Sequence, residues 1–326
     1  MVTEAISPEF LSKLEARGVS RRSFMKLCGS LAVAAGLSEL AAPRVARAIE
    51  DSVIGAESGG LYPAIWIEGA SCTGCTESFA QVDAPDPATV VLEMVSLNYC
   101  ETLSAAAGWS MEEAKAQTIE AGNYILIYEG AVLEGWNGEA LRVANEPGTD
   151  HLVHAAENAN AVVALGSCAV NGGWMGANPN SAGALGVQQY LKKQGIDTPV
   201  INIPGCPPHP DWIVGTIGLG LQALATNTLG LLVKQGLDAN GRPKAFYKNV
   251  HMNCPHLSAF EAGHMVKTMS DKDGCRFSMG CKGPRSACDS FERKWNNGVN
   301  WCVNNATCIG CTSPTFPDGQ SPFYVN

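Results

Sequence analysis

Ala161-Val162-Val163-Ala164-Leu165 is a run of five apolar residues that leads straight into Gly166-Ser167-Cys168. An unbroken apolar run of this length is typical of a strand that is buried on both faces of a sheet. The cysteine follows the strand directly. Open parallel sheets bind their ligands at the carboxyl ends of their strands, so this stretch predicts both the fold class and the place of a site.

Four further short runs have the same apolar character and predict strands. They are Ala64 to Glu68, Val90 to Leu97, Tyr124 to Tyr128, and Val200 to Ile203. Helices are expected between these runs and after the last one, at Ser110 to Ile119, Ala184 to Lys193, and Asp211 to Ala223. The alternation favours an α/β fold, with a parallel sheet covered by helices on both sides.

Cysteines also follow the first and the fifth strand. Cys72 and Cys75 come after the first strand, and Cys206 comes after the fifth. Together with Cys168 they are four thiols on three strand-end loops, which a parallel sheet brings to one edge. A C-x-x-C pair lets two thiolates bind one metal centre, although alone it also fits zinc or redox thiols.

Composition limits the possible functions. The chain has 326 residues, of which 46% are hydrophobic, so a sizeable core can form. A net charge of −9 argues against nucleic acid as the main partner, because such binding depends on Lys and Arg. Thirteen cysteines are far more than an ordinary chain of this size has, and they must be disulfides, metal ligands or reactive thiols.

The first 48 residues have the features of a twin-arginine export signal. The motif at residues 20–26 contains Arg21 and Arg22, a weakly apolar stretch follows, and Ala46-x-Ala48 suits signal peptidase. We expect cleavage after Ala48 and a periplasmic mature chain without a transmembrane segment of its own. This route exports folded proteins, so cysteines that fold in the reducing cytoplasm favour metal ligation over disulfides.

The composition of the chain changes near Thr226. After this point Gly, Pro, Asn and Cys become more frequent, and long apolar runs disappear. We therefore predict a sheet domain at residues 49–225 and a loop-rich domain at residues 226–326. Core packing alone looks too weak to hold the second domain, whereas metal binding would add folding energy there.

The second domain contains two more possible ligand sets. One is His251, Cys254, Cys275 and Cys281; the other is Cys288, Cys302, Cys308 and Cys311. Setting aside Cys28 in the signal and Cys100, expected to be a buried thiol, the chain offers eleven cysteines and one histidine. These are three complete sets of four.

The cysteines also fit two other interpretations, disulfides and zinc sites. Without Cys28 the cysteine count is even, so six disulfides are arithmetically possible. Three zinc sites would fit the ligand types equally well. The other histidines lack a cysteine at ligand spacing and are expected to be surface or structural, with His256 a possible neighbour of the second set.

Several ordered motifs resemble the small subunit of nickel–iron hydrogenases over essentially the whole mature chain. They are Cys72-Thr73-Gly74-Cys75-Thr76-Glu77-Ser78, Gly166-Ser167-Cys168, Gly205-Cys206-Pro207-Pro208, Arg242-Pro243, His251-x-x-Cys254-Pro255, Gly280-Cys281-Lys282-Gly283-Pro284 and Cys308-Ile309-Gly310-Cys311. The resemblance implies a flavodoxin-like domain and a loop-rich domain. It implies that the first set holds the proximal 4Fe-4S cluster, the His251 set the distal one, and the Cys288 set the medial one.

Two positions depart from the common family pattern. Cys302 stands where most members have a proline and a three-iron medial cluster, so the resemblance is to the nickel–iron–selenium subgroup, whose medial cluster has four irons. The medial cluster would be 3Fe-4S if Cys302 is not a ligand. Gly74 occupies a position where oxygen-tolerant members carry an extra cysteine, so we expect an ordinary four-cysteine proximal cluster.

The resemblance implies a hydrogenase in which this chain has no catalytic residue of its own. The nickel–iron site would lie in a large partner subunit, and electrons would pass to an acceptor such as a periplasmic cytochrome c. Glu77 and Glu129 are expected near the subunit interface, or as capping or surface carboxylates. Competing hypotheses are the single-cluster subunit of a quinone-reducing complex and an exported binding protein stabilised by zinc or disulfides.

Overall fold

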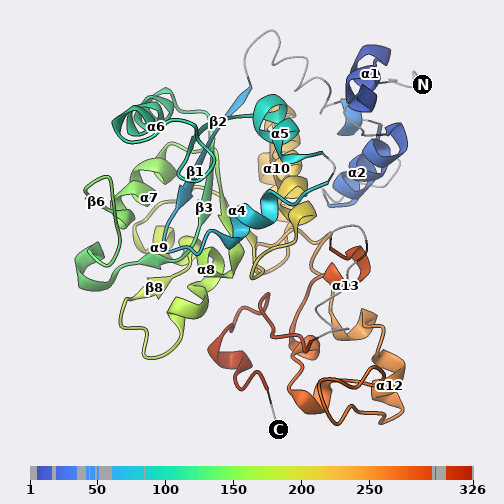
Figure 1. Ribbon diagram of the computed structural model, residues 1–326. Helices are drawn as coiled ribbons and strands as arrows, with labels where there is room; N and C mark the ends of the chain where they lie inside the picture. Colours follow the sequence, from blue (N-terminus) through green and yellow to red (C-terminus); the bar gives the residue numbers. More distant parts are fainter. Residues whose placement is uncertain are drawn as a thin grey trace.

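A parallel sheet of five strands forms the centre of the protein in this computed structural model (Figure 1). The structure describes residues 6–16, 20–34, 42–43, 45–47, 50, 61–83, 85–295, 298 and 306–324. In sheet order the strands are β2 (Val95–Cys100), β1 (Tyr62–Glu68), β3 (Ile125–Glu129), β7 (Ala161–Leu165) and β9 (Val200–Ile203). Numbered along the chain this order is 2-1-3-4-5, which is the flavodoxin-like arrangement. The predicted fold class is confirmed.

Alternate residues of each strand face different helical layers. Ile65 and Ile67 lie in the core cluster beneath α6 (Trp109–Ala121), α7 (Gly148–Glu157) and α9 (Val187–Lys193). Ala64 and Trp66 lie in the cluster on the opposite face, with α4 (Gly74–Phe79) and α10 (Pro210–Ala225). Figure 1 shows the two layers on either side of the strands. Burial on both faces explains why the strands have almost unbroken apolar runs.

The predicted second strand begins too early. Residues 87–94 are helical instead, as α5 (Pro87–Thr89) followed by the π-helical turn η2 (Val90–Met94). The Asp86 side chain accepts a hydrogen bond from the Thr89 backbone N–H at 3.1 Å, and Pro87 follows it in the first helical turn. An Asp cap with proline behind it is a helix start, which overrides the apolar run after it.

The remaining elements of the sheet domain are short. They are β4 (Val132–Leu133), η3 (Gly135–Gly138), β5 (Arg142–Val143), β6 (Glu146–Pro147), α8 (Gly166–Asn171), η4 (Gly173–Gly176) and β8 (Ala184–Leu185). Since Ala184 and Leu185 pair with β4, the predicted helix at 184–193 begins at Val187.

Short helical turns joined by loops make up the C-terminal region, at the bottom of Figure 1 in orange and red. They are α11 (Leu229–Leu231), η5 (Leu232–Gly236), η6 (His251–Asn253), α12 (Leu257–Glu261), η7 (Phe277–Met279), η8 (Gly283–Arg285), α13 (Ser290–Arg293) and η9 (Asp318–Gln320). One small buried cluster there pairs Val250 with Phe291, with Cys254 and Cys288 against it. This region has little apolar packing of its own.

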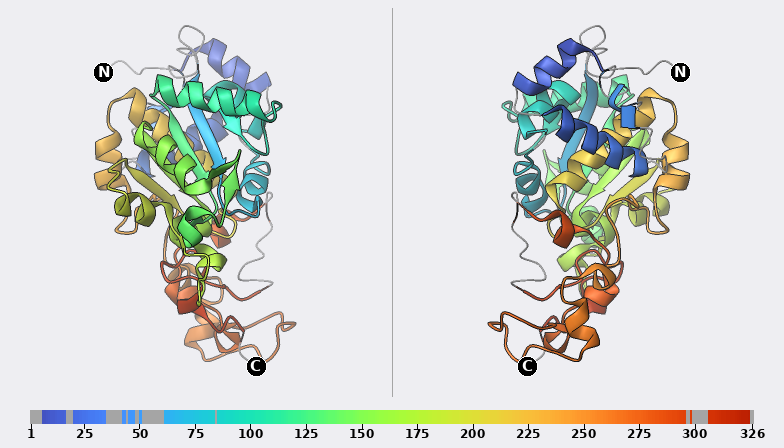
Figure 2. Two further views of the ribbon diagram at one scale, coloured as in Figure 1. Left: turned by 90° about the vertical axis from the view of Figure 1, so that its left-hand side faces the viewer. Right: turned by 90° about the vertical axis from the view of Figure 1, so that its right-hand side faces the viewer.

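Two helices precede the sheet domain, α1 (Pro8–Ala16) and α2 (Arg21–Ala34). They lie beside α10, on the side of that helix away from the sheet (Figure 2). Among the helices that the structure describes, none is long and apolar enough to cross a membrane.

Candidate iron–sulfur sites

The first ligand set gathers at the carboxyl edge of the sheet. Cys72 and Cys75 follow β1, Cys168 lies in α8 directly after β7, and Cys206 follows β9. Burial, then the Glu129 carboxylate and the other three sulfurs, raises the pKa of the Cys75 thiol well above its usual value. The Cys75 sulfur therefore lies near the other three predicted thiols.

Glu129, the last residue of β3, is only 1% exposed, and its carboxylate accepts hydrogen bonds from the loop that carries Cys72 and Cys75. One of its oxygens accepts hydrogen bonds from Ser71 Oγ at 2.7 Å and the Cys75 backbone N–H at 3.1 Å. The other accepts from the Thr76 backbone N–H at 3.0 Å and from Thr76 Oγ1 at 2.7 Å. The carboxylate thus fixes the C-x-x-C backbone, whereas Glu77 is exposed on the surface.

Glycines allow the backbone to approach two of these sulfurs closely. Gly166 has φ of 89°, and a Cβ atom there would stand 2.5 Å from Cys75 Sγ. Gly173 has φ of 53°, and a Cβ atom there would stand 2.5 Å from Cys168 Sγ. Any side chain at either position would fill the space beside the thiols and strain the backbone.

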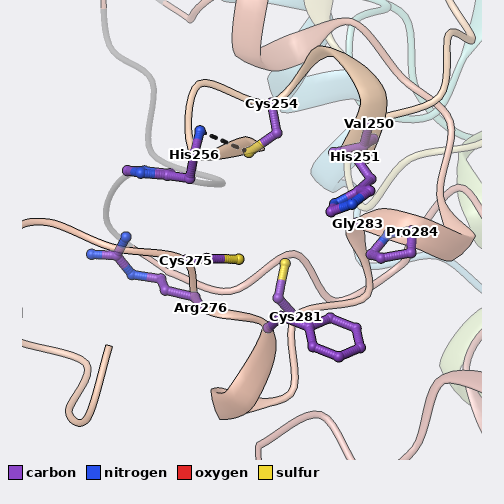
Figure 3. A pocket seen from close by; sticks show the side chains of 10 residues that line it. Val250, His251, Cys254, His256, Cys275, Arg276, Cys281, Gly283 and Pro284 are labelled. Carbon is purple, nitrogen blue, oxygen red and sulfur yellow. Dashed lines mark hydrogen bonds between the residues drawn. The ribbon is translucent and has the colours of Figure 1, made fainter. Parts of the chain in front are cut away.

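The second set lines one small cavity in the C-terminal region (Figure 3). His251, Cys254, Cys275 and Cys281 all border it, so the structure brings the four predicted residues together. His256 borders it too, and its backbone N–H donates to Cys254 Sγ at 3.4 Å. His256, which the sequence suggested as a possible neighbour of this set, does lie beside it.

The third set borders a larger cavity of about 190 Å³. Cys288, Cys308 and Cys311 line it, while Cys302 lies outside the described residues. Burial, followed by the Cys281 and Cys288 sulfurs, raises the pKa of the Cys308 thiol to about 12.

The third set lies between the other two in space, although it comes last in sequence. Cys206 of the first set lines the same cavity as Cys308. On the other side, the Lys282 backbone N–H, next to Cys281, donates to the Cys308 carbonyl at 2.7 Å. The spatial order is therefore first, third, second.

A single hydroxyl joins the first and third sets, and sequence reasoning missed it. Ser167 Oγ donates to the Cys311 carbonyl at 2.6 Å and accepts from the Gly205 backbone N–H at 3.0 Å. Ser167 is 1% exposed. It stands beside a predicted ligand, but its partners lie 38 and 144 residues away along the chain, so no local signal could reveal them.

The donor chemistry fits iron–sulfur clusters. Each cysteine within the described ranges is a free thiol, and Cys28 and Cys100 are fully buried outside the three sets. In those same ranges no group of three or more His, Cys, Asp or Glu side chains is spaced to hold one metal ion. Burial raises the pKa of a thiol in each set, as at Cys75, Cys254 and Cys308, so thiolates gathered at one point need a positively charged partner, which an iron core supplies.

Fold and donor sets together define an iron–sulfur protein built on a flavodoxin-like sheet. Residues 72–219, which include the first set, match the family model described as the NADH ubiquinone oxidoreductase 20 kDa subunit. Residues 246–324 match the family model for the C-terminal part of the NiFe/NiFeSe hydrogenase small subunit, and this match spans the other two sets.

Individual relatives agree. The periplasmic [NiFeSe] hydrogenase small subunit of Desulfomicrobium baculatum is 37% identical over 94% of this chain and 99% of its own. The periplasmic [NiFe] hydrogenase small subunit 1 of Nitratidesulfovibrio vulgaris is 37% identical over 96% and 95%. A chain of the oxidised [NiFeSe] hydrogenase from Desulfovibrio vulgaris Hildenborough superposes with a TM-score of 0.78 and 44% identity, over 82% of this chain and 99% of that one. The protein belongs to the NiFe/NiFeSe hydrogenase small-subunit family.

Proposed function

We propose that this chain relays electrons between the hydrogen-activating nickel–iron site of a large partner subunit and an external acceptor. The observation that carries the proposal is the spatial order of the three donor sets, which runs from the first set at the sheet edge through the third set to the second. Iron–sulfur clusters bound there would supply one-electron sites in that order.

The twelve ligands are proposed as three 4Fe-4S sets. They are Cys72, Cys75, Cys168 and Cys206 (proximal); Cys288, Cys302, Cys308 and Cys311 (medial); and His251, Cys254, Cys275 and Cys281 (distal). Imidazole in place of a thiolate lowers the negative charge of the distal set, which favours a higher potential there.

Hydrogen bonds of two buried side chains fix the positions of the first and third sets. Glu129 fixes the loop of Cys75, and Ser167 ties that edge of the sheet to Cys311. At the other end, Met252 is 65% exposed and Phe277 is 48% exposed beside the second set. An electron acceptor could approach there.

Export and partners follow from the same hypothesis. Residues 1–48 would direct the folded chain through the twin-arginine route to the periplasm, with cleavage after Ala48, a residue outside the described ones. The mature chain would consist of domains 49–225 and 226–326. Its partners would be a large subunit, with selenium if it follows the subgroup of Cys302, and a periplasmic cytochrome c.

The relay can be tested apart from hydrogen splitting. In the purified heterodimer, Cys308→Ser should lower hydrogen-driven reduction of cytochrome c by at least about a hundredfold, since a gap in the relay slows every turnover. Hydrogen–deuterium gas exchange, which needs no external acceptor, should persist. Cys100→Ser, outside the three sets, should keep both activities. Unchanged cytochrome reduction in Cys308→Ser would overturn the relay.

The fourth medial ligand has its own test. Cys302→Pro should convert the medial site to three irons, which give an electron-spin-resonance signal in the oxidised protein. The same signal in the unsubstituted protein would mean that Cys302 is not a cluster ligand, because the medial site would then hold three irons without the substitution.

A further inference from the structure

Helix α10 is apolar on all sides. Trp212, Ile217 and Leu221 pack toward the sheet. Leu219 and Ala223, one turn apart, belong to a different buried cluster on the outer side of the helix. A helix that is apolar all round is stabilised by cover on both sides, so this outer face suits an apolar occupant.

The occupant in this structure is the segment before the sheet domain. It buries Ile6, Phe10, Phe24, Cys28, Ala32, Ala42, Val45 and Ala46 against Ile201, Leu219, Ala223, Leu232 and Leu237. Phe10 and Phe24 meet edge to face at 5.6 Å between ring centroids and join α1 to α2. The residues from Ile6 to Ala46 lie before the predicted cleavage after Ala48, and the residues from Ile201 to Leu237 lie after it.

A polar contact also crosses the predicted cut. The Glu50 side chain is fully buried and accepts from the Ser7 backbone N–H at 2.8 Å. Its second oxygen pairs with Arg47 Nη1 at 3.3 Å. Glu50 would be the second residue of the mature chain, so cleavage removes both partners.

The docked segment exposes one part of the export motif and hides another. Arg21 and Arg22 are exposed at the start of α2, whereas Phe24 is 5% exposed. Ala46, two residues before the predicted cut, is fully buried. A peptidase could not bind this stretch while it is docked.

We propose that the outer face of α10, with Leu232, Leu237 and Ile201, is a docking site for the chain's own export segment. The inference rests on the proposed export route. Ile201 lies in β9 and Leu219 in α10, the two elements that flank Cys206. The segment can therefore dock only after the unit that presents this ligand has folded, and docking shields apolar residues of the signal together with Ala46, two residues before the predicted cut.

Cys28 provides the readout, because it is fully buried in this cluster. The full-length precursor would be purified with its large subunit from cells that lack the twin-arginine translocase. Modification of Cys28 by a maleimide, followed by peptide mass spectrometry, should be at least about tenfold slower in the folded precursor than in urea, because labelling requires local opening. Equal rates would overturn the proposal.

Two substitutions on one helix supply the matched comparison. Ala223→Glu places a carboxylate in the docking face and should bring the Cys28 labelling rate close to the rate in urea. Ala225→Glu, at an exposed position of the same helix, should leave Cys28 protected. An equal effect of both variants would contradict docking on this face.

A chain that begins at Ile49 tests whether Ala223→Glu acts through the export segment. There the face is open, so the substitution should change the melting temperature by no more than about 2 °C. A larger loss would overturn the proposal, because another part of the mature protein would then cover Ala223. Iron content and hydrogen-driven reduction of cytochrome c, measured on the same samples, report on the relay independently of labelling.

Discussion

The sheet domain and the C-terminal region are held together by different forces. In the sheet domain, side chains such as Ile65, Leu126 and Leu165 are fully buried between two helical layers. In the described residues from 226 to 324, the longest helix has five residues, and the local apolar cluster centres on Val250 and Phe291. Apolar burial stabilises the first region, whereas the second has little of it, and we predict that its stability depends on what its thiols bind.

Removal of iron and sulfide should produce the largest difference in stability between the two regions. Structural metal binding contributes on the order of 10 kcal/mol to small domains, so the C-terminal region should lose its hydrogen-exchange protection while β3 and β7 keep theirs. Exchange measured by mass spectrometry on the holo and stripped heterodimers gives the answer. Equal loss in both regions would mean that the sheet also depends on its cluster.

A core truncation in the sheet should have the next largest effect. Leu126→Ala removes a fully buried side chain and should lower the free energy of unfolding by about 3 kcal/mol. Denaturant titration should show the same loss with and without iron. Leu92→Ala, at a side chain that is 69% exposed, is the control and should change stability by less than about 0.5 kcal/mol.

Glu129→Gln tests the residue that links the buried sheet to the C-x-x-C loop of the first set. The amide NH₂ would face donors that now bond a carboxylate, and we expect a cost of about 2 kcal/mol at the C-x-x-C loop. Iron should be released from the first set at a lower temperature, as followed by the visible absorption of the clusters. Glu77→Gln, at an exposed carboxylate beside the same loop, should release iron as the wild type does.

The smallest expected effect concerns the contact between the two regions. Ser167→Ala removes the bond to the Cys311 carbonyl and leaves the Gly205 N–H without that acceptor, at a cost of about 1 kcal/mol. Hydrogen exchange should rise around Cys311 and Gly205 but not in the centre of the sheet. Ser270→Ala, at an exposed serine, should leave the exchange pattern unchanged.

Much of the sheet could be predicted because its strands are buried on both faces. β7 and β9 have the predicted bounds, and β3 is shifted by one residue. β2 was wrong at its start because a local cap at Asp86 outweighs the apolar run that follows. Helix α7 was not predicted, and its side chains are buried on one face only.

The grouping of candidate ligands could be predicted in part where two of them are close in sequence. His251 and Cys254 are three residues apart, and they border one cavity with Cys275 and Cys281. The roles of Glu129 and Ser167 could not be found in this way. Their hydrogen-bond partners are distant in sequence and meet them only in the folded chain.

Metal and sulfide analysis of the pure heterodimer tests the central claim most directly. Three four-iron clusters predict about twelve irons and about twelve acid-labile sulfides in this chain, with nickel confined to the large subunit. Zinc without sulfide, or about four irons in all, would contradict a relay of three clusters.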